Sequence, residues 1–341
     1  MLAAEMTTQT VLPRWRGFNL LEMFTVNSDG DFCEDDFRWM RDWGFDFARI
    51  PACYTLWIEG DDPYKLHEPM LEKVDRVVRL GQQYGIHISL NFHRAPGYSV
   101  NHERDEPYNL WKDQNALDAF CFHWQTFAKR YRGIASADLS FDLVNEPPNP
   151  EEGRPPHYPM TRKDHERVVR AAVAAIREID PDRLIIADGM GYGRIPAPEL
   201  NDTGIAQSCR AYEPMGVSHY KASWVNGMDW PVPQWPGGWH YGETWGRAEL
   251  EQAYQPWIEL AAQGIGVHCG EAGAFSYTPH PVVLAWFRDV LEILTAHNIG
   301  YALWNFRGSF GIIDSGRTDV VYEEWHGHQL DRAFLDLLQE F

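Results

Sequence analysis

Short apolar runs alternate with longer amphipathic segments along almost the whole chain. Several of the runs are apolar at nearly every position, as expected for strands that are buried on both faces of a parallel sheet. The pattern predicts eight strands, at residues 17–21, 45–51, 87–93, 140–147, 183–189, 216–220, 266–273 and 300–306.

Helix-length segments lie between these runs. In residues 68–84, Met70, Val74 and Val77 follow the three- and four-residue spacing of one helix face. Thr161 is a suitable N-cap for a later helix. Besides residues 68–84, the pattern predicts helices at 115–131, 161–179, 247–263, 281–297 and 328–340.

Strand–helix alternation repeated eight times indicates a parallel barrel rather than an open sheet. No G-x-G-x-x-G follows the first strand, which weighs against a dinucleotide-binding fold. No linker, low-complexity stretch or internal repeat divides the 341 residues, a length that suits one such barrel. We therefore expect an α/β protein, a (β/α)8 TIM barrel forming a single domain over residues 1–341.

Polar side chains gather at the last positions of the predicted strands. A single polar residue there would indicate only a solvated strand end, but most of the eight strands carry one. In a barrel the C-terminal strand ends build the active site, and the opposite face serves stability. The residues concerned are Arg49, His93, Asn145, Glu146, His219, Tyr220, Glu271 and Trp304.

The net charge of −19 changes the range of partners that we consider. Nucleic acids and anionic membrane surfaces are bound through clustered Lys and Arg, so neither is an expected partner. A neutral polymer such as a polysaccharide is compatible with this charge. No run of 18 apolar residues predicts a membrane helix, and the first residues lack an apolar segment of signal-peptide length. We expect a cytoplasmic protein, or a secreted one whose signal peptide is absent from this chain.

The five cysteines are widely spaced and include no C-x-x-C. This spacing predicts free thiols rather than a disulfide framework or a structural zinc site. We expect no metal and no organic cofactor.

Aromatic residues are abundant, with 15 Trp, 15 Tyr and 17 Phe. Two long loops follow predicted strands, a proline-rich one at 147–160 and one at 221–245 that holds five Trp. Tryptophans spaced among Pro and Gly are not needed in a buried core, whereas indole rings can stack on the apolar faces of sugars. We expect Trp224, Trp230 and Trp235 to contact substrate.

Two of the strand-end residues are carboxylic acids on different strands, Glu146 on the fourth and Glu271 on the seventh. Hydrolysis of a glycosidic bond needs one carboxyl to protonate the leaving oxygen and a second to attack the sugar or activate water. A separation near 5 Å predicts retention of configuration, and one of roughly 6.5–9.5 Å predicts inversion. Four further acidic residues are expected to be structural or peripheral: Glu22, Asp188, Glu213 and Asp314.

The segment LVNEP at 143–147 resembles the Asn-Glu-Pro signature that closes strand four in clan A glycoside hydrolases. Together with ARIP, NFH, SHY, CGEAG and ALWNF, in the same order, it is similar to glycoside hydrolase family 5, the cellulase family. The ordered set covers essentially the whole chain and is far more specific than N-E-P alone.

The resemblance implies a role for each matching position. It makes Glu146 the general acid/base and Glu271 the nucleophile. It makes Asn145 the partner of the sugar 2-hydroxyl and Arg49 the cation beneath the nucleophile. Three further positions complete the match: His93 at the end of strand three, His219 on strand six, and Trp304 as the floor under the sugar.

The chain departs from the family at strand six. The family often has His-x-Tyr there, and its Tyr hydrogen-bonds the nucleophile, whereas this chain reads His219, Tyr220, Lys221. The partner of Glu271 is therefore left open between Tyr220, Tyr212 and Tyr241.

The implied activity is a retaining β-glycoside hydrolase that acts on β-1,4-linked glucan or its oligosaccharides by double displacement. A β-mannanase or an exo-acting β-glucosidase or β-mannosidase would use the same chemistry. A carbohydrate-binding barrel without turnover is the alternative of another class, which the two supported glutamates argue against.

Overall fold

The computed structural model describes residues 10–100, 106–150 and 160–341. Eight parallel strands close into a barrel, because the order β2–β1–β13–β12–β9–β8–β7–β5 is completed by pairing of β2 with β5. The barrel strands are β1 (Arg16–Asn19), β2 (Phe47–Cys53), β5 (His87–Ala95), β7 (Leu139–Asp142), β8 (Leu184–Asp188), β9 (Ala206–Ala211), β12 (Val267–Ala272) and β13 (Gly300–Leu303). The predicted TIM barrel is confirmed.

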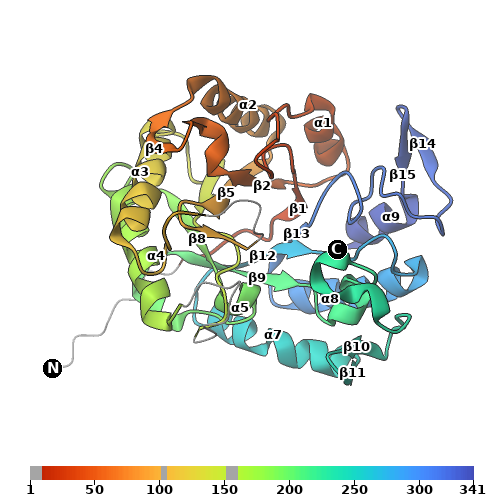
Figure 1. Ribbon diagram of the computed structural model, residues 1–341. Helices are drawn as coiled ribbons and strands as arrows, with labels where there is room; N and C mark the ends of the chain where they lie inside the picture. The colour runs from red at the N-terminus through yellow and green to blue at the C-terminus, as the bar shows by residue number, and fades with distance from the viewer. Residues whose placement is uncertain (1–9, 101–105, 151–159) are drawn as a thin grey trace.

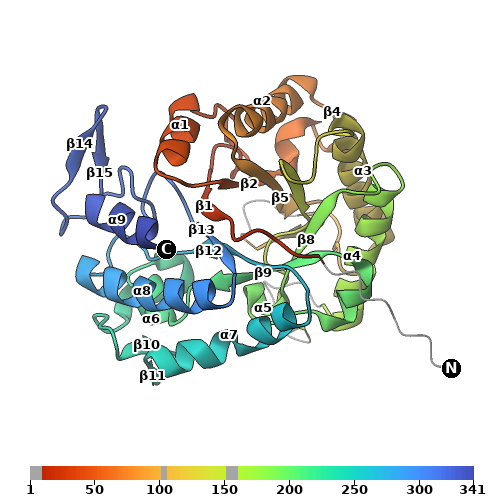
Figure 2. The ribbon, with the colours of Figure 1, turned by 180° about the vertical axis from the view of Figure 1, so that it is seen from behind.

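Helices surround the strands (Figure 1). They are α1 (Glu34–Asp42), α2 (Glu68–Tyr84), α3 (Gln114–Arg130), α4 (Arg162–Arg177), α5 (Met190–Gly193), α6 (Met215–Ser218), α7 (Arg247–Ala262), α8 (His280–Ala296) and α9 (Arg332–Glu340). From behind, α7 and α8 lie along one side of the barrel, and α2, α3 and α4 lie along the other (Figure 2). Thr161 caps α4 as predicted, in a capping box with Asp164.

Smaller elements decorate this frame. The helix predicted from residue 328 begins later, at Arg332, because residues before it pair in a hairpin. The short strands are β3 (Ile58–Glu59), β4 (Asp62–Leu66), β6 (Tyr98–Ser99), β10 (Gly238–His240), β11 (Glu243–Trp245), β14 (Glu323–Trp325) and β15 (His328–Leu330). The 3₁₀ turns are η1 (Tyr54–Trp57), η2 (Pro198–Thr203), η3 (Ser223–Val225) and η4 (Gly227–Asp229).

The predicted sixth strand at 216–220 is wrong. That segment belongs to the short helix α6, which is apolar because it is buried and packs against β10 and α8. The sixth strand is β9, ten residues earlier. Its polar residues concealed it, since Gln207 and Arg210 are buried and hydrogen-bonded rather than exposed.

The strand–helix alternation is also incomplete between β8 and β9. Only the four-residue α5 and the 3₁₀ turn η2 lie there. Gly191 and Tyr192 have φ values of 62°, in the left-handed region, so a regular helix cannot continue through them.

Stacked rings fill the N-terminal end of the barrel. Trp15 stacks on His87 with ring centroids 3.7 Å apart, and Phe47 packs on His268. These rings and their apolar neighbours are buried. The barrel is therefore a packed core at this end, which leaves the polar C-terminal end for chemistry.

Close approach of β1 to β2 requires a glycine at residue 17. A Cβ added to Gly17 would lie 1.7 Å from the carbonyl oxygen of Phe47, which is backbone and cannot rotate away. We expect Gly17→Ala to lower the free energy of unfolding by at least about 3 kcal/mol, measured by urea denaturation. Gly246→Ala is the control, because the added Cβ makes only ordinary contacts there, and a loss of about 1 kcal/mol is expected.

Candidate active site

The buried ion pair of Arg49 organises the C-terminal end of the barrel. Arg49 lies on β2 and is 1% exposed. Its Nε donates to Asp142 at 2.6 Å, and its Nη1 donates to Glu271 Oε1 at 2.8 Å. Its Nη2 also donates to Asn145 Oδ1 at 2.9 Å. The cation predicted beneath Glu271 is thus in contact with it, and a buried guanidinium of this kind stabilises the carboxylate.

Glu271 is held from two sides. Arg49 binds Oε1, and the hydroxyl of Tyr212 donates to Oε2 at 2.9 Å. The pairing of β12 with β9 shifts register between Cys269 and Glu271, and Gly270 lies at this irregularity. A Cβ at Gly270 would collide with Ser208 and Arg210, so the bulge needs glycine. The partner of Glu271 left open by the sequence is therefore Tyr212, not Tyr220 or Tyr241.

Glu146 follows β7 in a left-handed conformation with φ of 47°. Its backbone N–H donates to Asp188 Oδ2 at 2.9 Å, and its carbonyl accepts from the Tyr98 hydroxyl at 2.5 Å. Burial, together with the negative charge of Glu271, raises the pKa of Glu146 to about 8. A carboxyl in this state is protonated near neutral pH and can donate a proton.

Two charged residues at the centre of the site were not among the predicted site residues. Arg210 on β9 donates to Asp188, Asn145 and Glu146. Asp188 ends β8 and also accepts the Glu146 N–H, so it is structural, as expected, but central rather than peripheral. The signal that could have found Arg210 is its spacing from Tyr212, since Arg-x-Tyr here stands where the family often has His-x-Tyr.

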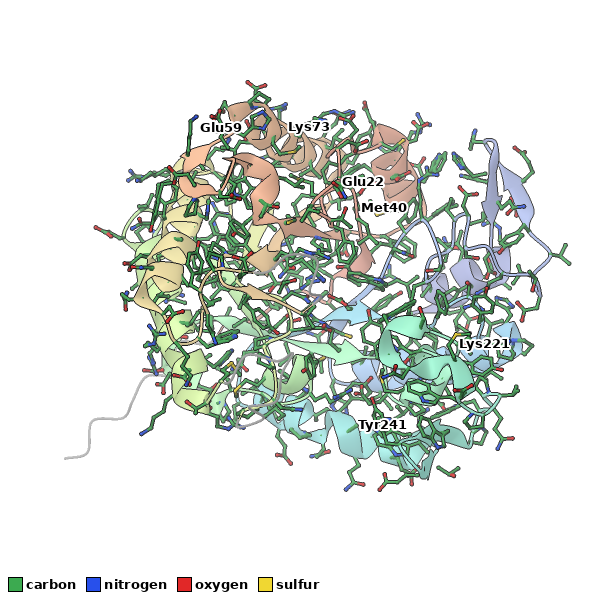
Figure 3. All side chains as sticks on the ribbon, in the orientation of Figure 1. Glu22, Met40, Glu59, Lys73, Lys221 and Tyr241 are labelled. Carbon is green, nitrogen blue, oxygen red and sulfur yellow. The ribbon has the colours of Figure 1, made fainter. Side chains whose placement is uncertain are left out.

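The residues predicted on strand six lie beside the site rather than on the barrel. His219 follows α6, and its ring contacts Tyr212 edge-on with centroids 5.0 Å apart. Burial lowers the pKa of His219 to about 3, so it stays neutral. Tyr220 is buried, with Lys221 over its ring. In Figure 3, Lys221 lies at the right of the molecule, just after α6, and Tyr241 lies lower, at the turn between β10 and β11.

His93 and Trp304 complete the polar rim. The Nε2 of His93 lies 3.5 Å from the Asn145 amide nitrogen, and burial drives its pKa well below the usual value. Trp304 follows β13 and packs against His93 and Phe24, with centroids 5.5 and 5.3 Å away. Its half-buried ring therefore lies next to His93, which in turn lies beside Asn145.

The three tryptophans of the 221–245 loop that were predicted to contact substrate have different surroundings. Trp224 is 56% exposed, and its ring contacts Phe275 and lies 6.1 Å from that of His219, so it borders the site. Trp230 packs on Trp239, away from these contacts. Trp235 donates its indole N–H to Asp289 of α8 and so anchors the loop to the barrel. Residues 151–159 of the other long loop, and residues 1–9, lie outside the described residues.

A cavity of about 240 Å³ opens beside β1. Asn19 lines it and also accepts a hydrogen bond from Arg49 at 3.2 Å, so the cavity borders the site. Glu22, which lies near Met40 of α1 in Figure 3, faces this cavity, and burial raises its pKa to about 7. Its place supports the expected peripheral role.

All five cysteines are free thiols, as predicted. Within the described part of the chain, no group of three or more His, Cys, Asp or Glu side chains is placed to hold a metal ion. Over the same residues, no helix combines the length and apolar character needed to cross a membrane.

Residues 6–309 match the family model described as Cellulase (glycosyl hydrolase family 5). A solved structure described as a glycoside hydrolase is 40% identical, with a TM-score of 0.90 over 96% of this chain and 99% of the other. Endoglucanase C of Acetivibrio thermocellus is 26% identical over 85% of this chain and 88% of its own. Cellodextrinase A of Ruminococcus flavefaciens is 24% identical, covering 78% and 76% of the two chains.

The fold and the family match define a barrel hydrolase of glycosidic bonds. The chain belongs to glycosyl hydrolase family 5, as the sequence motifs indicated.

Proposed function

We propose that this protein is a retaining β-glycoside hydrolase that cleaves β-1,4-linked glucan or its oligosaccharides. The observation that carries the proposal is the unequal environment of the two glutamates. Glu271 is paired with Arg49 and Tyr212, as a nucleophile should be, whereas Glu146 has a pKa near 8, as a general acid should have.

In the first step, a carboxylate oxygen of Glu271 attacks the anomeric carbon. The bond to the leaving oxygen breaks, and that oxygen takes the proton of Glu146. In the second step, water attacks the same carbon and gives its proton to Glu146. The bond to Glu271 breaks, so the carboxylate returns and the configuration is retained.

The surroundings of the pair support sugar binding. Asn145 is fixed by Arg49 and Arg210, so its amide is oriented toward a sugar hydroxyl, and His93 lies beside it. We assign Trp304 to the floor of the subsite and Trp224 to the neighbouring aglycone, while His219 positions Tyr212. The names of the relatives, endoglucanase and cellodextrinase, favour glucan as the substrate.

The test is a substrate panel of β-glucan, lichenan, cello-oligosaccharides, mannan and xyloglucan. We expect turnover of β-1,4-glucosidic substrates, with the β-anomer of the product formed first in the ¹H NMR spectrum. Preference for mannan would move the proposal to a mannanase, and release of single sugars from chain ends would make the enzyme exo-acting. Binding without any turnover would overturn it.

A further inference from the structure

Arg210 lies between the two glutamates and contacts both. Its guanidinium is buried, and Nε donates to Glu146 Oε1 at 3.2 Å. Nη2 lies 3.4 Å from Glu271 Oε1. Among the residues that the structure describes, Arg210 is the cation that contacts both glutamates, since Arg49 pairs with Glu271 but not with Glu146.

Asp188 fixes this guanidinium in place. Nη1 donates to Asp188 Oδ1 at 3.1 Å, and Nη2 donates to Oδ2, so the pair is bidentate. Nη1 also donates to Ser208, and Nη2 donates to Asn145. With all three nitrogens engaged, the side chain is positioned between the glutamates without freedom to turn away.

The site around Arg210 contains more carboxyl groups than guanidinium groups, so its net charge is zero only when two of the carboxyls are protonated. Two guanidinium groups, Arg49 and Arg210, face four carboxyls, of which Asp142, Asp188 and Glu271 are buried and Glu146 is half-buried. Burial opposes the charge of Asp188, but Arg210 and Arg49 outweigh it and lower its pKa. Burial and the charge of Asp188 raise the pKa of Asp142 to about 7, and Glu146 is raised to about 8. The raised pKa values of Asp142 and Glu146 both reduce this excess of negative charge, and Glu146 is the acid that is protonated in the resting site near neutral pH.

We infer that Arg210 is a positioning residue that serves as the shared counter-ion of the two catalytic glutamates, balancing Glu271 in the free enzyme and Glu146 in the covalent intermediate. This inference rests on the proposed function. When Glu271 forms the ester with the anomeric carbon, its negative charge disappears as the leaving oxygen takes the Glu146 proton. Arg210 then faces the new Glu146 carboxylate, which becomes the base that accepts a proton from water. Release of the sugar restores the Glu271 charge.

Apart from Glu271, the other charged groups that act on Glu146 keep their charge in this cycle. His93, close to Asn145, stays neutral because burial holds its pKa far below the usual value. Arg194 lies further off and is paired with Glu213. The charged groups facing Glu146 are Glu271, Asp188, Arg49, Arg194 and Arg210.

The test compares Arg210→Met and Arg210→Lys with the wild-type enzyme. With 2,4-dinitrophenyl cellobioside, kcat reports hydrolysis of the intermediate and kcat/KM reports its formation. We expect Arg210→Met to lower kcat about 100-fold and kcat/KM far less, because loss of the cation leaves the Glu146 carboxylate uncompensated in the second step. With phenyl cellobioside, the basic limb of kcat/KM should move up by about one pH unit or more, since the cation lowers the Glu146 pKa. Arg210→Lys should show a smaller loss and a smaller shift.

Arg183→Met is the matched control. Arg183 is also buried and paired with an aspartate, Asp180, but its other partners are backbone carbonyls of residues 131–139. The Arg183→Met enzyme should be less stable to heat. Both limbs of its pH profile, and the ratio of kcat to kcat/KM, should be the same as in the wild type. Equal losses in both steps with unmoved pH limbs in Arg210→Met and Arg210→Lys would overturn the inference. Absence of a covalent sugar on Glu271 after treatment of the wild type with a 2-fluoro cellobioside would instead overturn the proposed function.

Discussion

Replacement of Glu271 by alanine is expected to lower kcat/KM by at least about 10⁴-fold, because no other group can form the covalent intermediate. The substitution leaves the Arg49 and Tyr212 donors without their carboxylate partner, in a space vacated by the side chain. Added azide can enter that space and attack the sugar directly. A single displacement inverts the configuration, so an activated β-glycoside should yield the α-glycosyl azide, identified by NMR.

Asp36→Ala is the control for this variant. Asp36 is a buried carboxylate paired with Arg307, as Glu271 is paired with Arg49. It is neither of the two glutamates to which we assign a catalytic role. We expect it to lower stability and to give no response to azide. Failure of azide rescue in Glu271→Ala, together with an inverted product from the wild type, would contradict the retaining mechanism.

Replacement of Glu146 by alanine is expected to lower the rate of the first step most for substrates whose leaving group must be protonated. Loss of a general acid lowers the rate about 10²- to 10⁴-fold, so natural glucan and phenyl cellobioside should be affected most. With 2,4-dinitrophenyl cellobioside the first step should be nearly normal and the second slow. Azide should accelerate that second step and give the β-glycosyl azide, because it replaces water in a double displacement.

The pH dependence gives an independent readout of the same residue. The pKa of Glu146 is raised to about 8, so the acid form is present below that pH and is lost above it. Wild-type kcat/KM for phenyl cellobioside should therefore fall as pH rises through about 8, and Glu146→Ala should lack this basic limb. A wild-type profile that still rises above pH 9 would contradict the assignment of Glu146 as the acid.

The barrel could be predicted from the sequence because short, largely apolar runs mark most of its strands. The segments around Phe47, Ile88 and Ile186 are buried on both faces, and their regular alternation with helix-length segments favours strands. Glu146 and Glu271 could be named as candidates for a related reason, since each lies at the end of a predicted strand and in a recognisable motif. The burial of Glu271 and the ion pairs of both residues could not be predicted from the same pattern.

The remainder was hidden because polar residues inside the barrel resemble surface residues in a sequence. The apolar pattern of β9 is interrupted by Gln207, Ser208 and Arg210. Only the fold shows that their hydrogen-bond partners are also buried. Conversely, Val217 and its neighbours looked like a strand because a buried short helix is equally apolar. Tyr212 could be named only as one of three alternatives until the strand was placed correctly.

The left-handed backbone conformation of Glu146 affects both the stability and the proposed activity of this protein. For a residue with a Cβ, that conformation is disfavoured by about 1–2 kcal/mol, and glycine would adopt it freely. Hydrogen bonds from the Glu146 N–H to Asp188 and from the Tyr98 hydroxyl to the Glu146 carbonyl hold the backbone in this conformation. The residue that we propose as the general acid thus has a backbone conformation in which glycine would be more stable, so stability and the proposed catalytic role impose opposite requirements at this one site.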